Sequence, residues 1–300
     1  MIRKIPENVK IDPSETRQNF KEINIKLFCC RYWILDEWDC QDLSVPFWRI
    51  YYNSIEGAKI NYQNCTTLLN KKSLIVIPPN TAFTGMLNKD RSGDSENISG
   101  RKFLPTDDIA GIKKKNKVDH LFIHFSLGFP MDYTQPAIHT LKKSKSQARL
   151  IAAIQRTCIQ QNHFGFFDGL KIISLISSCL LKLESSLPTP HATDPRIATV
   201  MDVVHRDYNK PISNAAFAAM VNLAPNSFAR LFKNATGITI QQYIAKKRIE
   251  NALNLIHHSD KNMDEIAHEC GFSDRFHFSK SFKKSLHVSP AYYKKNLTLF

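Results

Sequence analysis

The sequence predicts an α+β protein with a β-rich N-terminal part and an all-helical C-terminal part. Short apolar runs rich in aromatic and β-branched residues fill residues 26–77, with turn residues between them. Apolar residues then recur at helical spacing in residues 147–187. Finally, residues 213–293 contain one two-helix pattern twice, at an offset of 50 residues between Phe228 and Phe278. These three observations predict a strand domain, a pair of helices and a tandem helical repeat.

The composition favours a soluble protein with a polyanionic partner. The chain has 300 residues, which is enough for two domains. Its formal net charge is +14, and clustered Lys and Arg side chains release counterions when they bind phosphates. Residues 1–7 lack the apolar region of a secretory signal, and no stretch reaches the roughly 18 apolar residues of a membrane span. We therefore expect a cytoplasmic protein whose seven cysteines, which form no C-x-x-C pair, are reduced.

The β-rich part predicts a small antiparallel barrel or sandwich after an irregular polar arm at residues 1–25. Residues 118–126 have the same strand character. Residues 85–117 are strongly polar and contain two charge clusters, so we predict a long flexible insertion there. The strands expected before the insertion are residues 27–30, 47–52, 58–62, 66–69 and 73–77.

Two helices and a linker are predicted after the strands. The second helix is apolar nearly all round, which exceeds what packing against one sheet requires, so we expect it to form a homodimer contact. Residues 185–195 are rich in Ser, Thr and Pro, which is typical of a linker. The predicted organisation is a regulatory and dimerisation domain at residues 1–184, this linker, and a helical domain at residues 196–300.

The first copy of the repeat predicts two short helices joined by a tight turn. The Ser213 hydroxyl can accept from the free backbone N–H groups of a helix start. Asn222 stands where a helix ends in a left-handed residue, a conformation that Asn tolerates better than other non-glycine residues. Pro225 suits the first position of the second helix, which needs no N–H partner. The expected core residues of this copy are Phe217, Ala218, Val221, Phe228, Leu231 and Phe232.

The second copy repeats this chemistry after a long connecting helix. Thr239 and Gln242 form a T-x-x-Q capping box, and apolar residues then keep near-helical spacing as far as His258. A stiff connector of this kind holds the two copies at a fixed separation. The signals of the second copy are Asn262 and Glu265 as cap, Gly271 as turn and Ser273 as the start of its second helix.

Paired helix-turn-helix units with basic outer faces indicate DNA binding. The second helix of such a unit enters the major groove, where Arg and Lys pair with guanine and small polar residues contact base edges or phosphates. A tandem pair reaches two neighbouring groove segments, roughly 34 Å apart along one face of the duplex. The alternative is that these side chains are simply exposed to solvent on the surface of the helix and contact no DNA. The predicted DNA contacts are Asn226, Ser227, Arg230, Lys233, Arg275, His277, Ser279, Lys280 and Lys284.

The run from Ile266 to Lys283 and the terminal motif Ser289-Pro290-Ala291-Tyr292-Tyr293 closely resemble the AraC/XylS family of bacterial transcription regulators. Two residues depart from the family pattern. Ala229 cannot hydrogen-bond a base edge where a polar residue is common, and Asn222 replaces the usual turn glycine. We expect the first departure to cost base readout and the second to cost little. The resemblance places the base-reading positions on Asn226, Ala229, Arg230, Arg275, Phe276, Ser279 and Lys280.

The resemblance also implies a role for the N-terminal part. In that family the regulatory domain is often a cupin-like β-barrel that binds a small molecule, and residues 75–79 and 120–125 are similar to its usual elements. It further implies promoter DNA and RNA polymerase as partners, with effector-responsive activation more common than repression. The candidate ligand-binding residues are Trp33, Trp48 and Tyr51, although alternation on a half-buried strand gives the same pattern and favours the core for Trp48.

Other classes of function remain open. His120 and His124 fall on one face of a predicted strand, yet no H-x-H or nearby carboxylate completes a metal set, so we expect no metal and no cofactor. Cys29 and Cys30 lack the basic neighbours, beyond Arg31, that activate a thiol. We expect no enzymatic activity. The alternatives are a metal-dependent cupin enzyme with a DNA-binding appendage, a repressor, and a regulator controlled by a protein partner without a small ligand.

Overall fold

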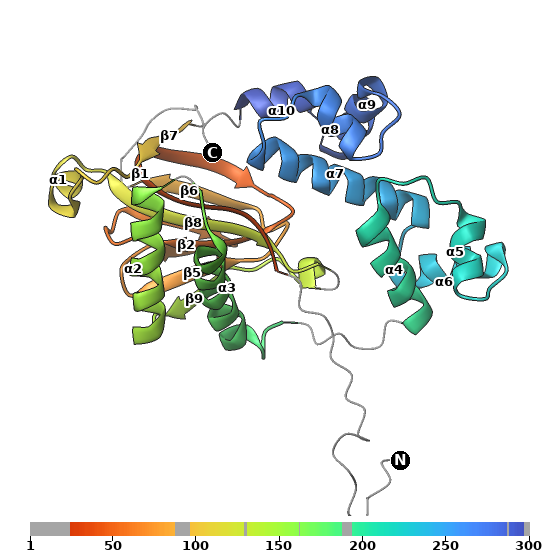
Figure 1. Ribbon diagram of the computed structural model, residues 1–300, viewed down its shortest axis with the longest axis horizontal. Helices are drawn as coiled ribbons and strands as arrows, with labels where there is room; N and C mark the ends of the chain where they lie inside the picture. Colours follow the sequence, from red (N-terminus) through yellow and green to blue (C-terminus); the bar gives the residue numbers. More distant parts are fainter. Residues whose placement is uncertain are drawn as a thin grey trace, which may run out of the picture.

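The protein has a β-barrel part and a helical part that meet at one end of a long helix, α7 (Ile240–His258) (Figure 1). This computed structural model describes residues 25–87, 97–128, 131–161, 163–187, 194–286 and 288–296. The predicted N-terminal arm and most of the predicted linker lie outside those ranges. Across them, no helix combines the length and the apolar character that crossing a bilayer requires.

One antiparallel sheet bends into a nearly closed barrel, which confirms the predicted fold of the N-terminal part. Its strands are β1 (Lys26–Leu43), β2 (Trp48–Tyr52), β3 (Ala58–Tyr62), β4 (Cys65–Leu68), β5 (Ser73–Ile77), β6 (Phe83–Leu87), β7 (Asn97–Lys102), β8 (Val118–Ser126) and β9 (His139–Lys142). They lie in the order β4-β3-β6-β1-β8-β2-β5-β9, with β7 beside β1. Register shifts after Leu27, Leu35 and Cys40 bend β1, so that this single strand pairs with β8, β7 and β6 in turn.

The prediction of a flexible insertion at residues 85–117 was wrong for residues 85–87, which belong to β6, and for residues 97–117. Strand β7 pairs with β1, and a short helix, α1 (Ile109–Lys114), lies against β8. Each of these elements buries one apolar side chain, Ile98 in β7 and Ile112 in α1. An element with a single buried residue has no hydrophobic periodicity, so the sequence does not reveal it. Residues 88–96 lie outside the described ranges.

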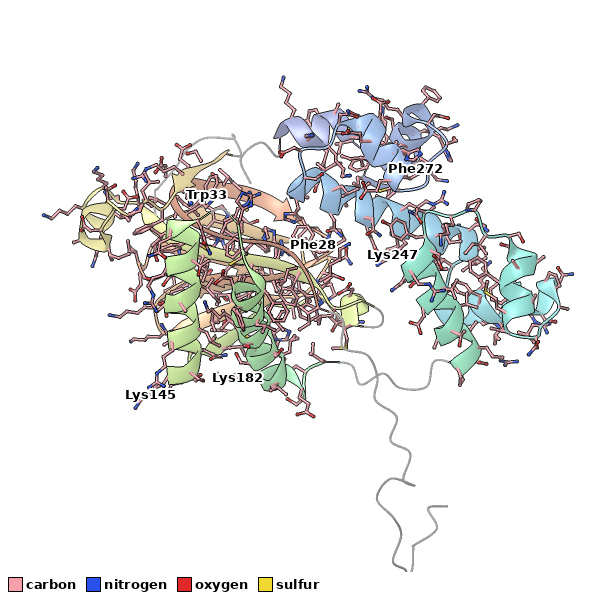
Figure 2. All side chains as sticks on the ribbon, in the orientation of Figure 1. Phe28, Trp33, Lys145, Lys182, Lys247 and Phe272 are labelled. Atoms are coloured by element: carbon pink, nitrogen blue, oxygen red, sulfur yellow. The ribbon has the colours of Figure 1, made fainter. Side chains whose placement is uncertain are left out.

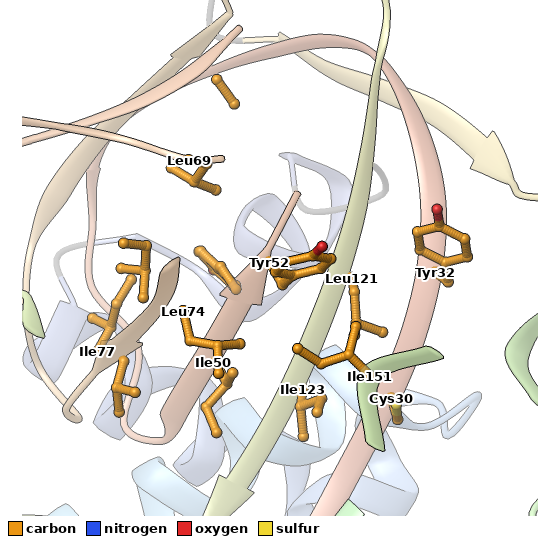
Figure 3. Close-up of a cluster of buried hydrophobic side chains, with 14 of the residues drawn as sticks. Cys30, Tyr32, Ile50, Tyr52, Leu69, Leu74, Ile77, Leu121, Ile123 and Ile151 are labelled. Atoms are coloured by element: carbon orange, nitrogen blue, oxygen red, sulfur yellow. The ribbon is translucent and has the colours of Figure 1, made fainter. Parts of the chain in front are cut away.

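Two helices cover the outer face of the barrel, as predicted. A capping box between Ser144 and Gln147 starts α2 (Lys145–Gln160), and α3 (Phe166–Leu180) packs beside it. Figure 3 shows Ile151 of α2 in one cluster with Leu121 and Ile123 of β8. Burial of each such side chain stabilises the fold by roughly 1.5–3 kcal/mol. The short helices η2 (Met131–Tyr133) and η3 (Leu181–Leu183) complete this part.

The end of α7 lies against the barrel beside β1, β2 and β8. The ring of Phe47, just before β2, lies 4.7 Å from the ring of His124 in β8, measured between centroids. The same ring lies 5.3 Å from His257 and 5.1 Å from His258, the last two residues of α7. These aromatic contacts join the barrel to the helical part.

The helical part contains two separate apolar cores that α7 connects. Phe217, Phe228 and Phe232 belong to the first core, and Phe278 and Phe282 belong to the second. The remaining helices are α4 (Pro195–Asp207), α5 (Asn214–Met220), α6 (Pro225–Thr236), α8 (Met263–Glu269), α9 (Arg275–Leu286) and α10 (Pro290–Asn296).

The repeat extends further than the sequence predicted, because α4 matches the second half of α7. The four core residues of α4 precede their counterparts in α7 by 52 positions: Ile197 and Ile249, Val200 and Ala252, Met201 and Leu253, Val204 and Ile256. Likewise, the first turn of α7 closes the first unit as α10 closes the second. Thus α7 belongs to both units.

The two units pack on opposite sides of α7. Its first-core residues are Ile240, Tyr243 and Ile244, whereas its second-core residues begin at Ile249. At 3.6 residues per turn, the average directions of these two sets differ by about 180°. Figure 1 shows the result, with α8 and α9 on one side of α7 and α4 and α6 on the other.

Candidate nucleic-acid interface

The turn of the first unit has the geometry that its sequence predicted. The Ser213 side chain accepts from the Ala216 N–H at 3.1 Å and so starts α5. Asn222 has a φ of 54°, the left-handed conformation expected after α5. Pro225 is the first residue of α6. Local turn chemistry therefore fixes where α6 begins and which way it points.

Helix α6 buries one face and presents the other to solvent. Phe228 and Phe232 have no exposed surface, and Leu231 is half-buried beside them. No acidic residue occurs within α6, so its outer side is positively charged. The predicted contact residues all lie exposed on it: Asn226, Ser227, Arg230 and Lys233, together with Ala229.

The second turn confirms most of the prediction, with one correction at its end. Asn262 and Glu265 form a reciprocal capping box, and Gly271 has a φ of 77°. The prediction that Ser273 opens the following helix was wrong. Asp274 is the residue before α9, and its side chain accepts a hydrogen bond from the His277 N–H at 2.7 Å. This bond lowers the pKa of the Asp274 carboxyl, because it favours the charged form.

Helix α9 presents a second basic face. Arg275, Phe276, His277, Lys280 and Lys284 are exposed on it, while Ser279 is half-buried. The helix contains no acidic residue. Phe276 is 79% exposed, so its ring is accessible to a partner.

One predicted contact residue has an intramolecular partner. Arg275 Nη1 lies 3.3 Å from Asp264 Oδ2 in α8, and both side chains are more than half exposed. A surface pair of this kind contributes about 0–1 kcal/mol, so DNA phosphates or bases can compete for the guanidinium at little cost. The pair with Asp264 therefore leaves Arg275 able to contact DNA.

Two further residues hold the units together, and sequence reasoning missed both. Arg248 of α7 donates from Nε to the Tyr208 carbonyl at 2.8 Å, and its guanidinium lies 5.9 Å from the Phe272 ring centroid. The backbone of Asn209 lies directly against Gly271. The segment after α4 thus contacts the turn of the second unit. No local sequence pattern predicts this tertiary contact.

The candidate ligand residues of the barrel do not converge on one site. Trp48 is fully buried, and its Nε1 donates to Asp132 at 3.0 Å. Tyr51 is also buried, which raises the pKa of its hydroxyl to about 12. Because these residues are three apart on β2, their side chains leave opposite faces of the strand. Trp33 is half-buried at the edge of the core (Figure 2). A ligand-binding role for these three residues stays a prediction.

Comparison with known proteins identifies the helical region. Residues 217–296 match the family described as "Helix-turn-helix domain". The probable transcriptional regulator LumQ of Photobacterium leiognathi is 32% identical over 123 residues, which are 41% of this chain and 50% of LumQ. The HTH-type transcriptional activator RhaS of Salmonella schwarzengrund is 31% identical over 111 residues, 37% of this chain and 40% of RhaS. The chain thus matches half or less of the length of these two relatives.

A solved structure shares the overall fold. ToxT from Vibrio cholerae O395, in a crystal structure bound to (E)-4-(8-methylnaphthalen-1-yl)but-3-enoic acid, has a TM-score of 0.50 and 15% sequence identity. The similarity covers 91% of this chain and 100% of that chain. At this level of identity it shows a common arrangement of barrel and helices.

These findings agree with the geometry of the helical part. The matched residues contain the turn of each unit, the whole of α7 and both exposed basic helices. The two relatives are named as a transcriptional regulator and a transcriptional activator. The comparisons therefore identify a helix-turn-helix domain at residues 217–296 and support its resemblance to the AraC/XylS family of bacterial transcription regulators.

Proposed function

We propose that this protein is a cytoplasmic, sequence-specific regulator of transcription that binds promoter DNA through α6 and α9. The main support for the proposal is that α6 and α9 are both exposed and contain no acidic residue. The two units that hold these helices share the connecting helix α7. Residues 196–300 would bind DNA, residues 185–195 would link the domains, and residues 1–184 would sense the signal and dimerise.

Each unit would place its second helix in a separate major-groove segment. Arg230 in α6 and Lys280 in α9 are the principal base contacts of this proposal, because both are exposed near the middle of these helices. Lys233 and Lys284 lie further along and suit phosphates. Phe276 would lie against the methyl group of a thymine or the sugar backbone, since apolar contacts read that methyl group.

Homodimerisation would use the exposed apolar side chains at the two ends of α3. Phe166 and Phe167 are 76% and 73% exposed at its start, and Leu181 is 73% exposed just after its end. Large exposed apolar side chains that gather in one region are typical of an interaction surface. A partner copy would bury them and place two DNA-binding domains on one promoter.

Regulation would act through the contact between α7 and the barrel. An effector that shifts the barrel strands would move Phe47 and, with it, the end of α7. We favour activation by recruitment of RNA polymerase, because RhaS is named as an activator. Repression and control by a protein partner are the alternatives.

Charge removal at the two proposed base contacts tests the function. Arg230→Ala and Lys280→Ala should each weaken specific DNA binding by about 1–3 kcal/mol, the scale of one lost bidentate base contact, without changing the helical circular dichroism. Gel-shift titration at one fixed salt concentration measures this. Lys114→Ala, which removes one exposed charge from α1 in the barrel part, is the matched control. Unchanged affinity in both helix variants would reject the assignment.

A further inference from the structure

A cluster of metal-binding side chains lies where α7 meets the barrel, away from the DNA-facing helices. Cys29 of β1, His124 of β8 and His258 of α7 each offer one ligand atom, and the three atoms lie within 4.8 Å of one another. Cys29 and His124 are cross-strand partners, so their side chains leave the same face of the sheet. The register shift after Leu27 falls immediately before this pair.

The two imidazoles have no hydrogen-bond partner that accounts for their position. His124 is 7% exposed, and neither of its ring nitrogens has a partner among the described residues. The same holds for both ring nitrogens of His258. A buried polar group without a partner costs roughly 1–3 kcal/mol, and each such group in a native protein requires an explanation. An ion that accepts a lone pair from each ring would supply one.

Aromatic rings enclose the cluster on several sides. The Phe28 ring stacks on His258 with centroids 5.6 Å apart and planes 4° apart. Phe47 lies against both histidines, and Phe122 lies 5.3 Å from His124. Figure 2 shows Phe28 at the side of the barrel that faces α7. An apolar shell of this kind restricts solvent access, as around metal centres.

We propose that Cys29, His124 and His258 bind a divalent ion of the zinc class and thereby tie the barrel to α7. One thiolate and two imidazoles are donors that Zn²⁺ favours, and three protein ligands leave a fourth position for water or a small anion. Around tetrahedral zinc the donor atoms lie roughly 3.3–3.6 Å apart, so ligand atoms that now lie within 4.8 Å of one another would approach by at most about 1.5 Å on binding. The thiol proton of Cys29 leaves to solvent as the ion binds.

The ion has a structural consequence because its ligands come from both parts of the chain. With the site filled, the end of α7 is coordinated to β1 and β8. Without the ion, the two parts still meet through packing contacts such as those of Phe47 with His257 and His258. If the protein binds DNA as proposed, occupancy of this site restricts the positions that α6 and α9 can take relative to the barrel. Metal binding would then regulate how the protein binds DNA.

Metal stoichiometry of the reduced, full-length protein tests the site without reference to DNA. We expect one Zn²⁺ or Co²⁺ per chain after dialysis, and a thiolate-to-cobalt charge-transfer band in the Co²⁺ form. Cys29→Ser should lose the band, and both Cys29→Ser and His258→Gln should lose the bound ion. Circular dichroism confirms that each variant is folded. Should the His258 variant fail to fold, Cys29→Ser, an isosteric change, decides alone.

Two neighbours provide matched controls. His257→Gln changes the adjacent imidazole, which bonds to Tyr293 instead, and Cys65→Ser removes an exposed thiol; both should keep full stoichiometry. No uptake by the wild-type protein above that of Cys29→Ser would overturn the proposal. A charge-transfer band that persists in Cys29→Ser would also overturn it, because the ion would then be adventitious.

DNA titration with and without Zn²⁺ separates the site from its regulatory consequence. We expect the DNA affinity of the wild type to change with Zn²⁺ and that of Cys29→Ser to stay constant. Stoichiometric binding with constant DNA affinity would overturn the regulatory role alone. Absence of DNA binding altogether would refute the proposed function, while the metal stoichiometry would still decide the site.

Discussion

The two helix-turn-helix units share one frame and differ in what surrounds them. In the first, His205 of α4 bonds through Nε2 to the Tyr243 hydroxyl at 2.8 Å; in the second, His257 bonds in the same way to Tyr293 at 3.1 Å. Burial lowers the pKa of both histidines to about 3, so both bonds are made by neutral imidazoles. The unit of duplication thus includes this closing pair as well as the two helices and the turn.

The residues that follow this pair differ between the units. Arg206 follows His205, is 71% exposed and pairs with Asp207. His258 occupies the equivalent place in the second unit and packs against Phe28 and Phe47 of the barrel. The two units therefore share the arrangement of their cores and differ at this surface position, which in the second unit contacts the barrel.

Core truncation is the largest expected perturbation and tests whether the two cores are equivalent. Phe228→Ala and Phe278→Ala each empty a fully buried site, so each should lower the free energy of unfolding by about 3–5 kcal/mol. Urea denaturation followed by circular dichroism measures both. A difference of more than about 1.5 kcal/mol between the variants would show that the cores are not equivalent.

The turns should respond unequally to the same substitution. Gly271 has a φ of 77°, and an added Cβ would lie 2.3 Å from the Asn209 carbonyl oxygen, so Gly271→Ala should cost about 3 kcal/mol or more. Asn222 is exposed and already carries a Cβ, so Asn222→Ala should cost only about 1 kcal/mol. Thermal unfolding compares the two, with Asn222→Gly as a neutral control. Equal losses would contradict the contact between Asn209 and the second turn.

Helix caps should give the smallest effects. Thr239 caps α7 and Asn262 caps α8 through the same reciprocal box, so replacement of either residue by Ala should cost about 1 kcal/mol. Thr199→Ala, on the exposed side of α4, should change stability by less than about 0.5 kcal/mol. A negligible effect of Thr239→Ala, measured by thermal unfolding, would mean that packing alone defines the start of α7.

Sequence reasoning succeeded where a feature depends on a few adjacent residues. Ser213, Asn222 and Pro225 specify the first turn by their own chemistry, and the structure has that turn. The barrel and its two covering helices also followed from local periodicity. Even the error at Ser273 was one residue in extent, because Asp274 caps a helix start equally well.

It failed where residues distant in sequence meet. The contact of Arg248 with Tyr208 crosses 40 positions, and the match of α4 to α7 was hidden because its offset is 52 rather than 50. The grouping of Cys29, His124 and His258 was also beyond prediction, because these residues lie on three different elements that meet only in the fold. Such groupings depend on the tertiary fold, for which one sequence provides no spacing rule.

The shared helix α7 has a consequence for the operators that this chain can recognise. Because α7 belongs to both units, one unit cannot rotate relative to the other. The angle about the duplex axis between their two contacts on DNA is therefore fixed. One additional base pair between those contacts would rotate the second by roughly 34° about the duplex axis. Natural operators should therefore keep an invariant spacer length, while the bases within the spacer are free to vary.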